Sequence, residues 1–382
     1  MLTIPIIFET NMEKQQFKLI NNILSVVVLV IASITYIMTV EPTTSFWDCG
    51  EFIASSYKLE VGHPPGNPVF QLIARFFTIF ASPENVAYAV NIMSALCSAF
   101  TIFFLYLTIV HLGRRLLEKS NDTTSLSSSI ALLGAGVVGS LAFCFSDSFW
   151  FSAVEAEVYA MSSLFTAIVF WAMLKWEEDD SKYANRWIIL IAFLMGLSIG
   201  VHLLNLLAIP ALAFIYYYKK SQKITLKNSI LVLLLSGVIL ITILYIIMPY
   251  LPKLAAITDL LFVNVFGLPF NSGAIVFMVL LFCLCFRAIY YTFKKGKTLA
   301  NTIILGTTMI VVGFSVFSVV VIRSSAKTPT NEYQPDNAYT LIRYLNREQY
   351  GSHPLIYGET YATPRIDYNT PTYWTELNGK YH

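Results

Sequence analysis

Residues 229–249 read SILVLLLSGVILITILYIIMP, and this stretch decides the fold class because it contains no charged side chain. A helix needs about 20 consecutive apolar residues to cross the hydrocarbon core of a bilayer. The whole chain of 382 residues is 56% hydrophobic and only 13% charged, whereas a soluble domain carries roughly 25% charged residues. The sequence therefore predicts an all-α polytopic membrane protein.

Similar apolar runs lie on both sides of this stretch. The runs 187–200 and 203–218 are short, and one bent element is an alternative to two spans. Residues 68–82 are apolar but short and contain Arg75, so we expect a half-helix or an interfacial helix there. The first run lacks a small-residue cleavage site after it, so we interpret it as a retained span and not as a signal peptide. The nine predicted spans are 23–40, 86–112, 130–146, 160–176, 187–200, 203–218, 229–249, 273–293 and 299–322.

Basic residues in the short loops predict the orientation, because cytoplasmic loops are enriched in Lys and Arg. One set of loops holds most of them, which places the N-terminus in the cytoplasm, and nine spans then place the C-terminal part outside. The net charge of only +2 gives no reason to expect a nucleic-acid partner. The basic residues on the predicted cytoplasmic side are Lys14, Lys18, Arg114, Arg115, Lys119, Lys182, Arg186, Lys219, Lys220, Lys223, Lys227, Lys294, Lys295 and Lys297, and those on the opposite side are Lys58, Arg75 and Lys253.

The predicted domain organisation follows from these spans. We expect a cytoplasmic N-terminus over 1–22 and a transmembrane unit over 23–323, with the first extracytoplasmic loop at 41–85. Residues 324–382 are polar and rich in Tyr, Pro, Asn and Thr. They are too few to build a good core alone, so we expect the start of a truncated extracytoplasmic region. Within it, 337–349 is helix-like and 354–357 is strand-like.

The first predicted outer loop carries two carboxylates in FWDCGEF, Asp48 and Glu51. If the chain is helical after Ser45, their spacing of three puts both on one face. Paired carboxylates suit acid/base catalysis because burial and mutual charge separate their pKa values. The alternative is that both merely favour the positive end of a helix.

The same loop contains the rigid turn GHPPGNP, residues 62–68, whose prolines and glycines fix an unusual backbone path. Such a turn would hold His63 in place to bind a phosphate oxygen or a sugar hydroxyl. A simple break before an interfacial helix is the alternative.

Further polar residues are predicted on the same side of the membrane. Glu155 and Glu157 lie in AVEAEVYA, where a spacing of two prevents a shared helical face, so we expect at most one in the site and slightly prefer Glu157. His202 and Asn205 lie in VHLLN and suit either a site or an interhelical hydrogen bond.

Two aromatic residues adjoin these carboxylates. Trp47 and Tyr159 are candidates for stacking on a sugar ring. The alternative is the belt of aromatic side chains that is common at membrane interfaces.

Residues 46–77, FWDCGEFIASSYKLEVGHPPGNPVFQLIARFF, resemble a bacterial membrane family that is related to protein O-mannosyltransferases. AVEAEVYA and GLSIGVHLLNLLAIP, residues 196–210, also fit that family. The resemblance implies a C-type glycosyltransferase arrangement in the bacterial inner membrane. It also implies a polyprenyl-phosphate-linked sugar donor, with mannose as the candidate sugar, and an extracytoplasmic acceptor such as a protein Ser/Thr hydroxyl or a glycan.

The resemblance also implies roles for individual residues. Asp48 matches the essential acidic position of the first external loop, with Glu51 as its companion, and it would act as general base toward the acceptor hydroxyl. The lipid phosphate needs positive charge, for which His63, Arg75 and Arg323 are candidates. A divalent metal is compatible with the acidic residues but is not required by them.

Two other function classes stay open. A transporter or flippase would carry charged residues near the middle of its spans and show two related halves. A non-catalytic assembly subunit would tolerate neutral replacements at Asp48 and Glu51. Most predicted spans have no charge at their centre, which favours the enzyme.

Overall fold

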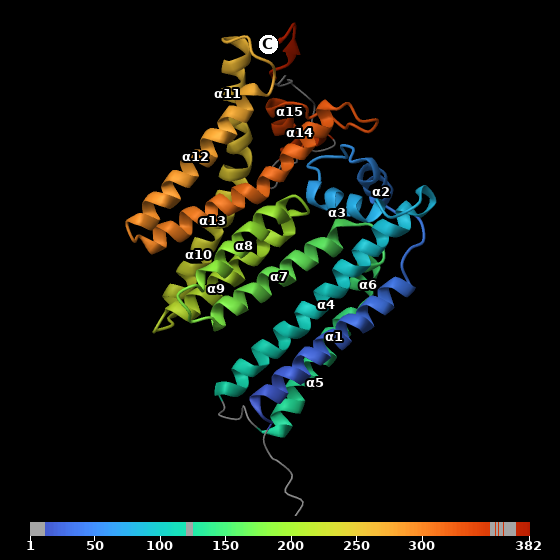
Figure 1. The fold of residues 1–382 in the computed structure, drawn as a ribbon, viewed down its shortest axis with the longest axis vertical. Coiled ribbons are helices and arrows are strands. Elements are labelled where there is room, and N and C mark those ends of the chain that lie inside the picture. The colour runs from blue at the N-terminus through green and yellow to red at the C-terminus, as the bar shows by residue number, and fades with distance from the viewer. Residues whose placement is uncertain (1–11, 120–124, 352–355, 357, 359–361, 363–371) are drawn as a thin grey trace, which may run out of the picture.

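The polypeptide folds into a bundle of long helices, with short connections at the two ends (Figure 1). The computed structural model describes residues 12–119, 125–351, 356, 358, 362 and 372–382. Within these residues, seven helices are long and apolar enough to cross a membrane. Their outward side chains include Leu234 and Leu284, which are 63% and 68% exposed, as expected for helices whose solvent is lipid. The prediction of an all-α polytopic membrane protein is confirmed.

The elements follow one another along the chain with short connections. The long helices are α1 (Lys14–Met38), α4 (Val86–Lys119), α5 (Leu126–Cys144), α7 (Val158–Glu178), α8 (Asn185–Ile199), α10 (Leu226–Thr242), α11 (Met248–Asn264), α12 (Ser272–Lys294) and α13 (Thr298–Phe314). The shorter helices are α2 (Cys49–Lys58), α3 (Pro68–Thr78), α6 (Asp147–Ala153), α9 (Ile209–Lys220), α14 (Ser318–Ser325) and α15 (Ala338–Leu345). The 3-10 helices are η1 (Pro83–Asn85), η2 (Leu203–Ala208), η4 (Ser315–Phe317) and η5 (Glu348–Tyr350), and η3 (Ile243–Ile247) is a short π-helix. Strands β1 (Glu376–Leu377) and β2 (Lys380–Tyr381) form a small hairpin.

The predicted number of nine spans is not confirmed. The predicted run 187–200 forms α8, which has 15 residues, and the run 203–218 divides into η2 and the 12-residue α9. The extended residue His202, with φ −162°, separates the two helices, so the alternative of one bent helix is not observed either. The run 229–249 belongs to a longer continuous helical stretch, Leu226–Asn264.

Helices α8 and α13 cross at close range because each presents a glycine to the other. A Cβ on Gly196 would lie 2.4 Å from the carbonyl oxygen of Ile310, and a Cβ on Gly313 would lie 2.4 Å from the backbone nitrogen of Leu197. Small residues at such crossings let helix backbones approach closely in a membrane. This contact joins the part of the bundle built from α1, α4, α5 and α7 to the part built from α10–α13 (Figure 1).

One end of the bundle, which we call the loop face, carries α2, α3 and the segment 326–350 (Figure 1). Helix α2 confirms the expected helix after Ser45, and α3 confirms a short helix within 68–82. Leu72 and Phe76 on α3, and Phe80 just after it, are exposed. An apolar outer surface on a short helix suits the predicted membrane interface.

The segment 326–350, which we call the C-terminal segment, is bonded to the first loop. The backbone N–H of Val61 donates to Thr330 at 3.1 Å, and that of Glu332 donates to Val61 at 3.1 Å. The guanidinium of Arg323 donates to the carbonyl of Leu59 at 2.6 Å. The first loop and the C-terminal segment therefore pack together at the loop face.

The last described residues are anchored to the top of α11. Helix α15 confirms the helix expected within 337–349, whereas the expected strand at 354–357 lies outside the described residues. The hydroxyl of Tyr381 donates to the buried carboxylate of Asp259 at 2.7 Å. Asp259 also accepts the backbone N–H groups of Asn271 and Gly273 at the start of α12, which satisfies donors that a helix N-terminus leaves free.

Candidate functional site

The site begins at the N-terminus of α2, where two carboxylates face one histidine. Asp48 is the residue before the helix and Glu51 lies in its first turn. Glu51 accepts both the backbone N–H of His63, at 2.6 Å, and a hydrogen bond with its Nδ1, at 3.0 Å. The other ring nitrogen, Nε2, lies 3.8 Å from the carboxylate of Asp48. The structure thus brings Asp48, Glu51 and His63 together, with Asp48 the most exposed of the three at 57%.

The turn that carries His63 is held by the C-terminal segment. The hydroxyl of Tyr344, a fully buried residue of α15, donates to the carbonyl of Gly62 at 2.6 Å and lies 3.2 Å from that of His63. Gly66 has φ +75°, and a Cβ there would lie 2.8 Å from the Tyr344 hydroxyl oxygen. The position of His63 therefore depends on residues more than 270 positions later in the chain.

Glu155 and Glu157 both turn toward the start of α2. The Ser45 hydroxyl donates to Glu155 at 2.7 Å, and the Cys49 thiol lies 3.8 Å from Glu157. Both reach this region because residues 154–157 form a bend before α7 begins, so helical spacing does not separate them. That at most one of the two is central to the site stays a prediction.

The pKa values in this cluster move in opposite directions. The hydrogen bond with Glu51 raises the pKa of His63, and the charges of Glu51, Asp48 and Glu332 add to the effect. Burial alone would raise the pKa of Glu51, but the bonds from His63 hold it below its usual value. Burial, followed by the charges of Asp48 and Glu155, raises the pKa of Glu157 to about 7. The cluster therefore pairs a His63–Glu51 couple, in which each residue favours the charged form of the other, with a carboxyl whose pKa lies near neutral pH.

Replacing Gly62 with alanine is expected to separate Glu51 from His63 without unfolding the protein. A Cβ at Gly62 would lie 2.4 Å from the Glu51 carboxylate oxygen, which is the mobile end of a side chain, so Glu51 moves and the turn stays. The pKa of His63 then falls toward 6.5 and that of Glu51 rises toward 4.5. Titration of the histidine ring signals by NMR measures the change directly.

The same substitution has a defined effect on the pH dependence of stability. A raised histidine pKa stabilises the fold below the unfolded value of 6.5, and a lowered glutamate pKa stabilises it above 4.5. The loss of stability in Gly62→Ala, of the order of 1 kcal/mol for a half-buried pair, is therefore expected to be largest between those pH values. An equal loss at pH 5.5 and pH 9 would contradict this account.

His63 also lines a pocket of about 330 Å³, and we call it the histidine pocket. Its polar wall consists of His63, Asn67, His202 and Arg347, and Phe52 and Phe317 contribute to its apolar wall. The backbone N–H of Leu204 donates to Nδ1 of His202 at 3.2 Å, which leaves Nε2 as the donor of that ring. None of the described residues that line this pocket is acidic.

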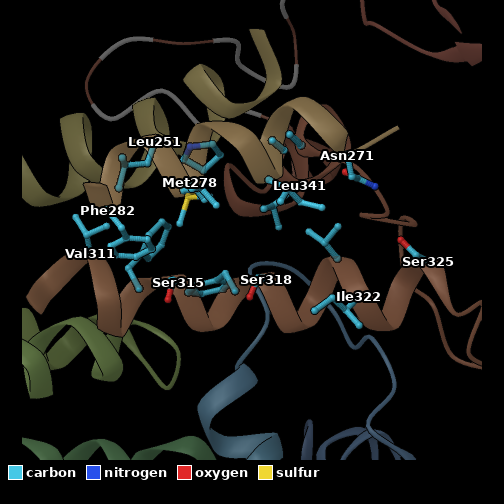
Figure 2. A pocket seen from close by; sticks show the side chains of 18 residues that line it. Leu251, Asn271, Met278, Phe282, Val311, Ser315, Ser318, Ile322, Ser325 and Leu341 are labelled. Atoms are coloured by element: carbon cyan, nitrogen blue, oxygen red, sulfur yellow. The ribbon is translucent and has the colours of Figure 1, made fainter. Parts of the chain in front are cut away.

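A larger groove of about 720 Å³ runs between α12 and the continuous stretch α13–α14 (Figure 2). Met278, Phe282 and Val311 line it toward the middle of the bundle, and Asn271 and Ser325 line its end near the loop face. Phe317 lines both this apolar groove and the histidine pocket, so the two spaces share a wall.

The other residues predicted from the sequence lie at different distances from this site. Trp47 is 85% exposed, precedes Asp48 and has φ +62°. The ring of Tyr159 lies 5.4 Å from that of His202. Arg75 donates to the carbonyl of Tyr57 and does not reach the histidine pocket.

Two candidates make contacts that do not involve the pocket. Asn205 is fully buried, accepts from Thr166 at 3.0 Å and donates to the sulfur of Met195. Its contacts fit the interhelical alternative. Arg323 donates to the carbonyl groups of Leu59 and Lys58 at the end of α2.

Several site residues were not predicted from the sequence. Asn67, Glu332, Tyr344 and Arg347 come near His63 only through the fold. Asn67 had a signal, since it stands between Gly66 and Pro68 in the same rigid turn. The other three lie in a polar segment without a motif. Among the residues that the structure describes, no three His, Cys, Asp or Glu side chains are arranged as metal ligands.

Comparisons with known proteins match this part of the chain. The family model of the protein O-mannosyl-transferase TMEM260 N-terminal domain matches residues 48–225. Protein O-mannosyl-transferase tmem260 of Dictyostelium discoideum is 26% identical over 211 residues, which is 52% of this chain and 24% of that protein. Protein O-mannosyl-transferase TMEM260 of Mus musculus is 30% identical over 176 residues, which is 46% of this chain and 23% of that protein.

These matches cover about a quarter of the length of each relative. No solved structure matches the chain significantly. The matched residues include Asp48, Glu51, His63 and both buried glutamates of the site. Residues 48–225 are therefore similar to the N-terminal domain of protein O-mannosyl-transferase TMEM260, and this similarity supports the O-mannosyltransferase-like resemblance of the sequence motifs.

Proposed function

We propose that this protein is a membrane glycosyltransferase that moves a sugar, with mannose as the candidate, from a polyprenyl-phosphate donor to an acceptor hydroxyl. The acceptor would be a Ser or Thr side chain of an extracytoplasmic protein. The observation that carries the proposal is the half-exposed carboxylate of Asp48 beside His63, which lines a pocket that has no acidic residue among its described lining residues. The names of the two relatives support the same activity.

The proposed reaction is one direct displacement. Asp48 accepts the proton of the acceptor hydroxyl, whose oxygen attacks the anomeric carbon of the sugar. The bond between that carbon and the phosphate oxygen breaks, and the lipid phosphate leaves with the electron pair. One displacement inverts the anomeric centre. Glu51 acts as companion by holding His63 beside Asp48.

The apolar groove supports a lipid-linked donor. It lies between two helices that are long and apolar enough to cross a membrane, and it shares the Phe317 wall with the histidine pocket. An isoprenoid chain in the groove would bring its phosphate close to that pocket. The groove excludes charged groups because desolvating them there is costly.

The proposed location is the bacterial inner membrane, with the N-terminus in the cytoplasm and the loop face outside. The distribution of basic residues supports this orientation. In this arrangement 23–323 is the transmembrane unit and 324–382 begins an extracytoplasmic region. Trp47, Glu155, Glu157, Tyr159 and His202 are then proposed to border the substrates, together with Arg75 and Asn205 in the surrounding shell.

A donor comparison tests the proposed function. The full-length protein in proteoliposomes would receive a Ser/Thr-rich acceptor peptide and either polyprenyl-phosphate-linked or nucleotide-linked mannose. We expect mass spectrometry to detect one added hexose with the lipid donor only. Transfer from the nucleotide donor alone would contradict the lipid-linked substrate. Absence of transfer by folded protein with a panel of lipid-linked sugars would contradict the enzyme and favour the transporter or assembly alternatives.

A further inference from the structure

The histidine pocket contains a buried hydrogen-bond donor that no described protein group satisfies. Asn67 is 6% exposed and lines the pocket, and its Nδ2 atom has no partner among the described residues. Asn67 precedes α3, yet its side chain forms none of the usual capping bonds with that helix. Leaving a buried amide donor unpaired is costly, so this arrangement points to a ligand that accepts a hydrogen bond.

Two further donors line the same space from different elements. His202 offers Nε2, because Nδ1 already accepts from the backbone of Leu204. Arg347 brings a guanidinium, which stays charged at every physiological pH. Burial lowers the pKa of His202, so Arg347 supplies the permanent charge.

The fold places Arg347 at the pocket through Tyr344. The Tyr344 hydroxyl fixes α15 to the carbonyl of Gly62, and Arg347 follows three residues later, where its backbone N–H donates to the Tyr344 carbonyl at 3.1 Å. Arg347 has φ +56°, which turns the chain out of the helix. Its guanidinium lies 5.0 Å from the ring centre of Tyr350, a distance suited to a cation–π contact.

His63 contacts both the acidic residues and the histidine pocket. Its ring nitrogens lie 3.0 Å from the Glu51 carboxylate and 3.8 Å from that of Asp48. His63 also lines the pocket together with Asn67, His202 and Arg347, and no described lining residue of that pocket is acidic. A pocket with donors and no acidic lining, next to a carboxylate that can accept a proton, suits a displacement with an anionic leaving group.

We infer that Arg347, Asn67 and His202 form the site that binds the phosphate of the lipid donor. This inference rests on the proposed function and deepens it, because it assigns the leaving-group site to a residue, Arg347, that lies outside the segment matched by the family model. Guanidinium forms paired hydrogen bonds with phosphate oxygens, and an amide adds a third donor. The C-terminal segment then completes the site.

Binding without transfer tests the inference. The full-length protein in nanodiscs would be titrated with polyprenyl phosphate and with the matching polyprenol, and native mass spectrometry would measure occupancy. Arg347→Gln is expected to weaken polyprenyl phosphate binding by about tenfold to a hundredfold, the range for bonds to charged groups, and to leave polyprenol binding unchanged. Equal weakening for both lipids, or no weakening, would overturn the inference.

A neighbouring arginine provides the matched control. Arg343 lies on α15, the helix that precedes Arg347, stacks over the ring of Tyr373 and does not line the pocket. Arg343→Gln removes the same charge and is expected to bind polyprenyl phosphate as the wild type does. Asn67→Asp keeps the side-chain shape, replaces the donor by an oxygen and is expected to weaken phosphate binding as well. Equal weakening by Arg343→Gln would show a long-range charge effect and overturn the site.

Two further measurements distinguish a lipid phosphate from free phosphate as the ligand, and a failure of the phosphate site from a failure of the proposed function. Inorganic phosphate at millimolar concentration is expected to compete with polyprenyl phosphate in the wild type, and binding of inorganic phosphate alone would overturn the lipid assignment. If Arg347→Gln loses binding while the wild type transfers no sugar, the phosphate site stands and the proposed function fails. If the wild type transfers sugar and Arg347→Gln binds and transfers equally well, the site fails and the function stands.

Discussion

Replacing Asp48 with asparagine is expected to slow sugar transfer by about 10²- to 10⁴-fold, the usual contribution of a general base. Asparagine keeps the shape of the side chain but cannot accept the proton of the acceptor hydroxyl. Asp48 is the more exposed of the two carboxylates that face His63, so an acceptor can approach it directly. Initial rates with the lipid-linked donor measure the effect.

A matched control for this variant lies on the same end of the bundle. Asp147 begins α6 and is exposed, and it has no contact with the His63 cluster among the described residues. Asp147→Asn removes one carboxylate charge from the loop face and is expected to transfer sugar at the wild-type rate. If Asp48→Asn and Asp147→Asn are equally active, Asp48 is not the base, and Glu157 becomes the next residue to test.

The Glu51→Gln variant separates chemistry from positioning. The Glu51 carboxylate accepts from the backbone N–H of His63 and is also hydrogen-bonded to its ring. The neutral amide weakens the couple, so the pKa of His63 falls toward its ordinary value. The alkaline limb of a rate profile that depends on protonated His63 should then move to lower pH, whereas Asp48→Asn lowers the rate across the whole profile.

Replacing Gly196 with alanine is expected to destabilise the fold by about 3 kcal/mol, at the upper end of the usual cost of overpacking. The new Cβ would lie 2.4 Å from the carbonyl oxygen of Ile310 and 2.9 Å from its Cα. Both are backbone atoms, so no side chain can rotate away and α8 must move from α13. Thermal unfolding in detergent, followed by intrinsic fluorescence, measures the loss.

Gly237 on α10 provides the control for this substitution. A Cβ there meets no atom within 4 Å, and alanine is the better helix former by about 0.5–1 kcal/mol. Gly237→Ala is therefore expected to be neutral or slightly stabilising. Equal melting temperatures for the Gly196 and Gly237 variants would show that the crossing of α8 and α13 is not a tight contact.

The sequence predicted the fold class well because lipid imposes a simple pattern on the chain. Stretches such as 229–249 must satisfy every backbone group internally, so apolar length alone predicts helices. The number of spans was less well predicted. The segment around His202 is as apolar as its neighbours, but α8 and α9 are short, and hydropathy does not report where a helix is interrupted.

The sequence predicted part of the candidate site because that part depends on local sequence patterns. Asp48, Glu51 and His63 lie within one loop, and a spacing of three along a helix and a rigid proline turn are local properties. Glu155 and Glu157 were expected not to share a helical face, and both lie near the start of α2 because the chain bends before α7. The spacing of two residues along the chain predicts the relative directions of their side chains only inside a regular helix or strand.

By itself the sequence determined that the chain is a helical membrane protein and which carboxylates lie in its first loop. Only the tertiary structure decided that Tyr344 holds the His63 turn and that Arg347 and Asn67 line one pocket. The physical reason is that these contacts join segments more than 270 residues apart. Such pairings depend on the packing of whole helices, which no local pattern of charge or hydropathy encodes.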